Sequence, residues 1–125
     1  MAKQSIKTIN DKAYVINAFM GEEGWSYIPR LTKYIFPFIG FAFNAEVKDE
    51  EVINQMMDLM SGENAKEVQV LVKELVKGVQ VDGSVVDFNK EFSQNYDALL
   101  LLVMEVIKLN YFDSFQRLVT NLKAE

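Results

Sequence analysis

The feature that most constrains this chain is the run Ala98 to Leu109, in which only Glu105 and Lys108 are polar. A helix that is apolar on every face must lie at the centre of a fold. As a helix the run is too short to cross a bilayer, which needs roughly 20 residues. The sequence therefore predicts a central core helix over 97–109. Glu105 and Lys108 lie three residues apart on one face, so an ion pair at the rim of the core is a stronger interpretation than a catalytic pair.

The segment before residue 44 predicts a helix over about 25–41 that is interrupted near a proline. Pro29 could occupy the first helical position, where its missing N–H is not needed. Pro37 should bend or end the helix, because its ring clashes with the preceding turn.

Two amphipathic helices are predicted next. Asp49 is a candidate N-cap for the first, and Gly62 is expected to stop it. The second begins with a capping box, Asn64 and Glu67, and ends at Gly78.

Two short segments predict β-hairpins. Residues 5–19 alternate weakly between apolar and polar positions around the turn sequence Asn-Asp-Lys. Residues 79–86 place β-favouring residues on both sides of Asp82-Gly83, a strong hairpin signal.

The last third of the chain completes the predicted fold. The central helix is expected to begin near Asp87 or Tyr96, and Asp113 with Gln116 predicts a capping box for a short last helix. The elements together predict a single α+β domain over 1–125. It is mainly α-helical, with about five helices around the central apolar helix and two small β-hairpins.

Composition excludes several kinds of chemistry. The absence of cysteine and histidine excludes disulfides, thiolate nucleophiles, the usual zinc sites and imidazole bases. No set of carboxylates converges by spacing, so we expect no catalytic residue, metal or cofactor. The net charge is −5, and residues 44–67 carry seven acids against two bases, which disfavours nucleic acid as a partner. We expect no membrane partner either, and the first residues do not resemble a signal peptide, so a cytoplasmic location is predicted.

Two apolar groups are candidates for a partner-binding or oligomer surface, although core packing is the stronger interpretation of each. Fifteen aromatic residues and six methionines are more than one small core comfortably hides, which favours an oligomer or a client-binding face. The candidates are the aromatic run Tyr34, Phe36, Phe38, Phe41 and Phe43 and the methionines Met56, Met57 and Met60.

The stretch VQVDGSVVDFNKEFSQNYDALLLLVMEVIKLNYFDSF, residues 79–115, resembles the C-terminal half of the tail assembly chaperones of long-tailed bacteriophages. In that family a hairpin with a turn glycine precedes a Phe…Phe…Asn-Tyr segment, an apolar helix and an Asn-aromatic cluster closed by phenylalanine. The N-terminal half fits more loosely. The matching positions are Phe88, Phe92, Asn95, Tyr96, Glu105, Asn110, Tyr111, Asp113 and Phe115.

One departure from the family pattern affects local geometry. The family often has Asn-Phe-Gly where this chain has Asn110-Tyr111-Phe112. A continuous or kinked helix is therefore expected in place of a tight glycine turn. Under the resemblance, Asn110 would satisfy carbonyls at the end of the central helix and Asp113 would cap the next helix. Tyr111, Phe112 and Phe115 would pack the two helices together or contact a neighbouring copy.

The resemblance implies a non-enzymatic protein of the host cytoplasm that binds and solubilises the tape-measure protein. It would help to recruit tail-tube subunits, associate with itself and be absent from the mature virion. Many such genes also yield a longer frameshifted product, of which this chain would be the short form. Two alternatives remain open: a small acidic phage protein that inhibits a host protein, and a structural tail component, although the latter is usually β-rich.

Overall fold

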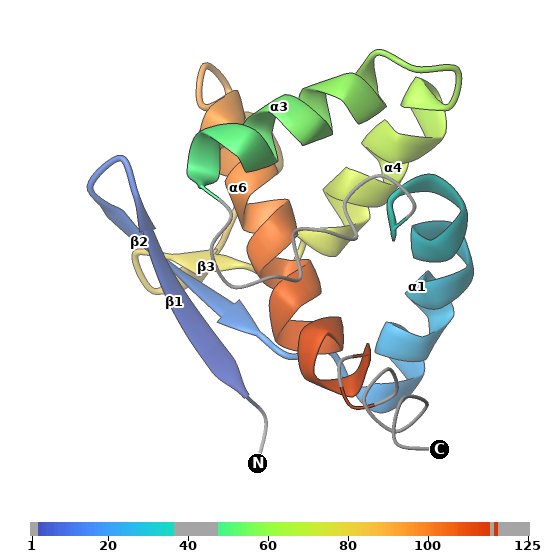
Figure 1. The fold of residues 1–125 in the computed structure, drawn as a ribbon. Helices are drawn as coiled ribbons and strands as arrows, with labels where there is room; N and C mark the ends of the chain where they lie inside the picture. Colours follow the sequence, from blue (N-terminus) through green and yellow to red (C-terminus); the bar gives the residue numbers. More distant parts are fainter. Residues whose placement is uncertain (1–2, 37–47, 116, 118–125) are drawn as a thin grey trace.

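The computed structural model describes residues 3–36, 48–115 and 117. Helix α6 (Tyr96–Ile107) runs through the middle of the molecule, with a β-sheet on one side and helices α1 (Gly21–Tyr34) and α4 (Ala65–Leu75) on the other, and α3 (Asp49–Met60) crosses its upper part (Figure 1). Every residue of α6 from Ala98 to Ile107 is buried except Glu105. The prediction of a central apolar helix is therefore confirmed.

The sheet contains four antiparallel strands in the order β1-β2-β3-β4. They are β1 (Gln4–Ile9), β2 (Lys12–Asn17), β3 (Gln80–Val81) and β4 (Ser84–Val85). The two predicted hairpins are present, and β2 pairs with β3 to join them into one sheet. This joining was not predicted, because it connects segments more than sixty residues apart in the sequence.

Both hairpin turns use left-handed backbone conformations. The φ angles are 51° at Asn10 and 67° at Asp11 in the first turn, and 53° at Asp82 and 81° at Gly83 in the second. Two successive positive φ angles are typical of type I′ turns, whose twist matches the twist of the flanking strands. The turn residues therefore explain why each hairpin closes where it does.

Helix α1 (Gly21–Tyr34) begins four residues earlier than predicted, and Pro29 lies inside it rather than at its first position. The start is displaced because the buried stripe of this helix already includes Gly24, together with Tyr27 and Leu31. A proline in a helix interior costs one backbone hydrogen bond, which packing must offset. The predicted break at Pro37 lies outside the described residues.

Helices α3 (Asp49–Met60) and α4 (Ala65–Leu75) follow, as predicted. Lys48 occupies the N-cap of α3, so Asp49 is the first helical residue instead of the cap. Asn64 does occupy the N-cap position of α4, but its side chain makes no capping hydrogen bond. Its φ of −100° and ψ of 22° lie outside the extended region from which an N-cap side chain reaches the first turn. The predicted capping box is therefore wrong.

A helix begins at or near each of the two predicted starts of the central helix, because the segment forms two separate helices. The Asp87 side chain caps the short helix α5 (Phe88–Phe92) by accepting hydrogen bonds from the backbone N–H groups of Asn89 and Lys90. The chain then turns at Gln94, which has a φ of 60°, before α6 begins.

After α6 the chain widens into the π-helical turn η2 (Lys108–Phe112) and continues in α-helical conformation to Phe115. The expected continuous helix is therefore observed. The prediction that Asp113 caps a new helix is wrong, because Asp113 is itself helical, with φ −62° and ψ −42°. Its carboxylate instead bonds to the Lys3 ammonium at 2.7 Å, and this exposed pair holds the pKa of Asp113 below its usual value.

The predicted ion pair between Glu105 and Lys108 is also corrected. Glu105 pairs with Lys7 of β1, at 3.7 Å between the charged atoms. Lys7 reaches this position because alternate residues of a strand face the same side, and Lys7 lies on the side that faces α6. The pair therefore links the sheet to the central helix.

Candidate partner-binding surface

The π-helical turn holds the link between β2 and α1 through Asn110. The Asn110 Nδ2 donates a hydrogen bond to the Val106 carbonyl at 2.9 Å. Its Oδ1 accepts one from the backbone N–H of Phe19 at 2.7 Å. Asn110 thus satisfies a carbonyl at the end of the central helix, the role expected for it, and also fixes a distant segment. π-helical turns occur frequently at functional sites, because they re-aim side chains within a helix.

Tyr111, next to Asn110, anchors helix α1. Its hydroxyl donates a hydrogen bond to the Gly24 carbonyl at 2.7 Å, and its side chain is 4% exposed. Burial raises the pKa of this tyrosine above its usual value, so the hydroxyl stays protonated and remains a donor. Phe19 and the Tyr111 hydroxyl both lie next to Gly24, on the face of α1 that packs on the π-helical turn.

An aromatic cluster extends from Tyr111. The ring of Phe36 lies 6.1 Å from that of Tyr111 and 5.2 Å from that of Phe115, both in edge-to-face geometry. Such pairs contribute about 0.5–1.5 kcal/mol beyond the area they bury. The cluster closes one end of the core between α1 and the C-terminal helical turn.

A groove of about 430 Å³ opens beside this cluster, between the start of α1 and the π-helical turn. Phe19, Ile28, Tyr111 and Phe115 are among the residues that line it. Trp25, the single tryptophan of the chain, also lines the groove, and it is 73% exposed. Met20 beside it is 78% exposed. Large apolar side chains this exposed at a groove are the usual anchors of a protein interface.

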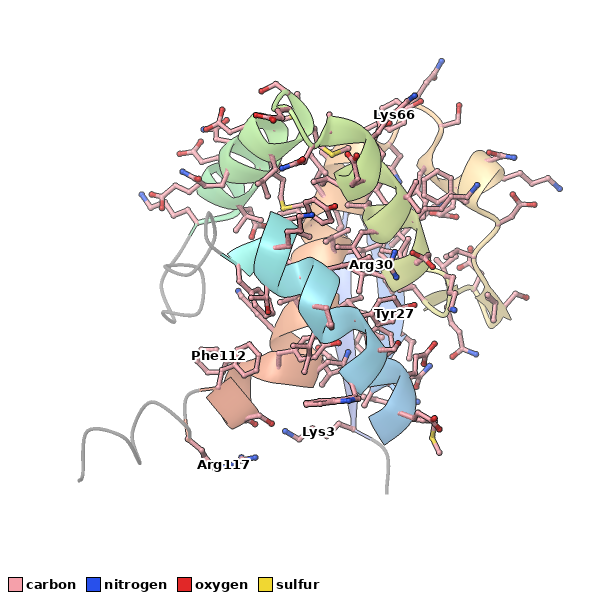
Figure 2. The ribbon with its side chains drawn as sticks, turned by 90° about the vertical axis from the view of Figure 1, so that its right-hand side faces the viewer. Lys3, Tyr27, Arg30, Lys66, Phe112 and Arg117 are labelled. Carbon is pink, nitrogen blue, oxygen red and sulfur yellow. The ribbon has the colours of Figure 1, made fainter. Side chains whose placement is uncertain are left out.

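The residues predicted for a partner surface differ in how exposed they are in the structure. Met56 and Tyr111 are buried in the core, so neither is available to a partner in this structure. Met57 is 55% exposed. Phe38, Phe41 and Phe43 lie outside the described residues. Phe112 is partly exposed at the end of η2 (Figure 2). The remaining candidates are partly buried against the core: Tyr34, Phe36, Met60 and Phe115.

Trp25 and Met20 were missed by the sequence analysis. With the helix predicted to begin near residue 25, the sequence did not determine which way the Trp25 side chain points. Gly24, Tyr27 and Leu31 form one buried stripe of α1, and Trp25 points about 100° away from Gly24, outside that stripe. Figure 2 shows Tyr27 and Arg30 on the side of α1 that faces α4, where Arg30 pairs with Glu74.

Substitution of Gly24 tests the packing under the groove. A methyl group there would lie 3.6 Å from Phe19 Cβ and 3.8 Å from the Tyr111 hydroxyl oxygen, which are ordinary contacts. Glycine inside a helix is less stable than alanine by about 0.5–1 kcal/mol. We therefore expect Gly24→Ala to raise the free energy of unfolding by about that amount in urea denaturation. Gly21→Ala is the control at the helix start, and a less stable Gly24→Ala variant would show that the junction cannot accept a methyl group.

A second polar cluster fixes the Phe…Phe…Asn-Tyr segment. The Tyr14 hydroxyl donates to a Glu91 carboxylate oxygen at 2.6 Å and accepts from the Asn95 amide at 3.3 Å. Lys12 pairs with the same carboxylate at 3.1 Å. Asn95 also accepts a hydrogen bond from the Asn10 amide. The cluster joins the first hairpin to α5 and α6, and we assign it a structural role because Tyr14 is fully buried.

The described part of the chain offers little for chemistry. Within it, no group of three or more acidic residues could hold a metal ion. None of its helices has the length and apolarity needed to span a bilayer. An apolar groove with exposed anchors on a helical scaffold fits the class of binding proteins.

Comparison with known families gives this class a name. Residues 10–123 match the sequence profile of a family described as phage tail assembly chaperone protein, TAC. The match covers most of the chain, which therefore belongs to this family of non-enzymatic chaperones. No curated protein and no solved structure matched the chain.

Proposed function

We propose that this chain binds and solubilises the tape-measure protein during tail assembly, and that its exposed groove contacts this client. Several copies act together in the host cytoplasm, help to recruit tail-tube subunits and leave before the virion is complete. Family membership supports the chaperone role. The proposal adds three specific steps to that role: binding of the tape-measure protein, recruitment of the tube subunits and departure before the virion is complete.

The observation that carries the proposal is the exposure of Trp25 and Met20 at the groove. A holdase must cover apolar side chains of a client without a unique fit. Methionine adapts to varied shapes, and tryptophan provides a large contact area at low entropic cost. A groove between helical elements suits one face of an amphipathic helix, which is a common mode of peptide recognition.

Charge supports the same function. Helix α3 begins with Asp49, Glu50 and Glu51, and all three are exposed. Acidic surface keeps a protein with exposed apolar groups soluble, because net charge opposes nonspecific association. Family membership favours this function over inhibition of a host protein, and the mainly helical fold does not favour a β-rich tail component.

The direct test is co-expression with the tape-measure protein of the same phage. We expect the wild-type chain to keep the tape-measure protein in the soluble fraction and to co-purify with it. Trp25→Ala should weaken binding about thirtyfold, as loss of an interface anchor of about 2 kcal/mol does. Its thermal midpoint should stay near that of the wild type, because the side chain is exposed.

Tyr96→Ala is the matched control, since Tyr96 is an exposed aromatic residue on α6 and does not line the groove. It should bind the client like the wild type. Equal binding by Trp25→Ala would move the client site away from the groove. A wild-type chain that leaves the tape-measure protein insoluble would refute the proposed function itself.

A further inference from the structure

The two edges of the sheet differ. At one edge β4 is two residues long, whereas at the other β1 has six. β1 lies at the outside of the sheet, on the side away from α1 and α4 (Figure 1). Short strands protect a sheet edge, but a long open strand is a template for pairing with another chain.

The pairing register identifies which backbone groups of β1 are open. Ile9 and Lys12 flank a two-residue turn, so they form a hydrogen-bonded pair, and every second pair along the ladder does the same. The bond from the Ala18 N–H to the Lys3 carbonyl, 2.9 Å, continues this alternation. The N–H and C=O groups of the intervening residues Gln4, Ile6 and Thr8 therefore point away from β2. No described residue bonds to them.

We propose that two copies of this chain pair through antiparallel β1 strands, around a two-fold axis at Ile6. Only residues whose backbone groups point outward can bond across such an interface. With Ile6 opposite Ile6 of the second copy, Gln4 lies opposite Thr8, and all the open groups find partners. A shift by two residues in either direction leaves some of them unpaired. The strand is thus complementary to itself, as a two-fold interface requires.

The side chains on this face suit the same arrangement. Ile6 is 67% exposed, and its cross-strand neighbour is Val15, followed by Gln80 and then Val85. Directly opposite residues of an antiparallel pair point to the same side of the sheet. The two Ile6 side chains would therefore meet and join the two rows into one largely apolar stripe.

Lysine in an edge strand commonly prevents such pairing, because the partner strand would cover an unpaired charge. Lys7 does not have this effect here. It points to the helical side of the sheet, and its ammonium lies 3.7 Å from Glu105 and 3.6 Å from Asp49 of its own chain. Its charge is already offset in each copy, so two β1 strands can approach without strong repulsion.

The inference deepens the proposed self-association of the chaperone, but it uses a surface separate from the Trp25 groove. We prefer a second copy of this chain over an extended peptide as the partner of β1. The outward-pointing backbone groups of β1 can all pair with those of an identical strand, so no other sequence is needed. Several copies joined in pairs would present several grooves to one long client, which raises the overall affinity without a new contact.

Single-cysteine cross-linking tests the register in the full-length chain, which has no cysteine of its own. In a hydrogen-bonded antiparallel pair the Cα atoms are about 5.5 Å apart, within the range that a disulfide bridges. Ile6→Cys treated with diamide should form a disulfide-linked dimer on a non-reducing gel. Thr8→Cys is the matched control, since its two copies would be offset by about 13 Å along the strands. Ile6→Cys should react at least about tenfold faster.

Charge reversal at the axis provides a second readout that needs no disulfide. Ile6→Lys and Ile6→Glu should each sediment as monomers, because like charges would face each other, while an equimolar mixture should form the dimer again. Trp25→Ala should dimerise like the wild type, so loss of client binding and loss of pairing are separable. A monomeric wild-type chain, equal cross-linking at residues 6 and 8, or dimers of Ile6→Lys would each overturn the proposal.

Discussion

Tyr111→Ala is expected to lower the free energy of unfolding by about 3–5 kcal/mol, as truncation of a large buried aromatic side chain does. Tyr111 is 4% exposed and packs against Phe36 and Phe115, and its hydroxyl holds the Gly24 carbonyl. The substitution would leave a cavity beneath the groove and detach the start of α1. Urea denaturation followed by circular dichroism measures the loss.

Two further variants separate the contribution of the Tyr111 ring from that of its hydrogen bond and control for the truncation. Tyr111→Phe keeps the ring and removes only the hydrogen bond, so it should cost about 1 kcal/mol. Tyr96→Ala makes the same truncation at a tyrosine that is 63% exposed, and it should change stability by no more than about 0.5 kcal/mol. If Tyr111→Ala were as stable as Tyr96→Ala, the π-helical turn would not anchor α1.

Tyr14→Phe is expected to cost about 1.5–3 kcal/mol at pH 7, the usual contribution of a hydrogen bond to a charged group. The Tyr14 side chain is fully buried, and its hydroxyl donates to the Glu91 carboxylate. Phenylalanine preserves the packing but leaves that carboxylate with Lys12 as its remaining charged partner. The difference in the free energy of unfolding between the two proteins is the quantity to measure.

This difference should depend on pH in a defined way on the acidic side. Burial raises the pKa of Glu91, but the hydrogen bonds from Tyr14 and Lys12 outweigh it, and the net pKa is lowered from 4.5. A lowered pKa in the folded state contributes stability above the unfolded value that is lost as pH falls through the folded value. The difference between wild type and Tyr14→Phe should therefore shrink below pH 4.5.

On the alkaline side the sign is reversed. Burial and the hydrogen bond to Glu91 raise the pKa of Tyr14 from 10.0 to about 12. The corresponding stability is fully present below pH 10.0 and is lost as pH rises towards 12. Titratable groups common to both proteins largely cancel in the comparison. A plateau between these limits is expected, and a difference that does not shrink below pH 4.5 would exclude a charge-assisted bond between Tyr14 and Glu91.

The regular elements followed from local patterns because their causes are local. The run from Ala98 to Leu109 has no polar face, so any fold must bury it. Asp82-Gly83 adopts a turn that few other residue pairs favour. Cap assignments were less successful, since Asn64 and Asp113 have suitable side chains but the wrong backbone conformation.

Assignments that depend on direction needed the tertiary structure. Adjacent residues on a helix point about 100° apart, so the choice of the face of α1 that packs on the core decides whether Trp25 is buried or exposed. In the same way, the π-helical turn decides that Tyr111 enters the core while Phe112 stays partly exposed. Residue type alone does not predict that Tyr111 is buried and Phe112 is partly exposed, because a tyrosine and a phenylalanine can both be buried in a core.

Local sequence patterns were enough to predict the helical class, the central helix, both hairpins and the family, since each rests on periodicity, turn chemistry or a motif over neighbouring residues. The three-dimensional fold was needed to show that the hairpins share one sheet, that Lys7 rather than Lys108 pairs with Glu105, and that β1 is an edge strand of the sheet. These features depend on contacts between distant segments, and packing of the whole chain around α6 selects those contacts.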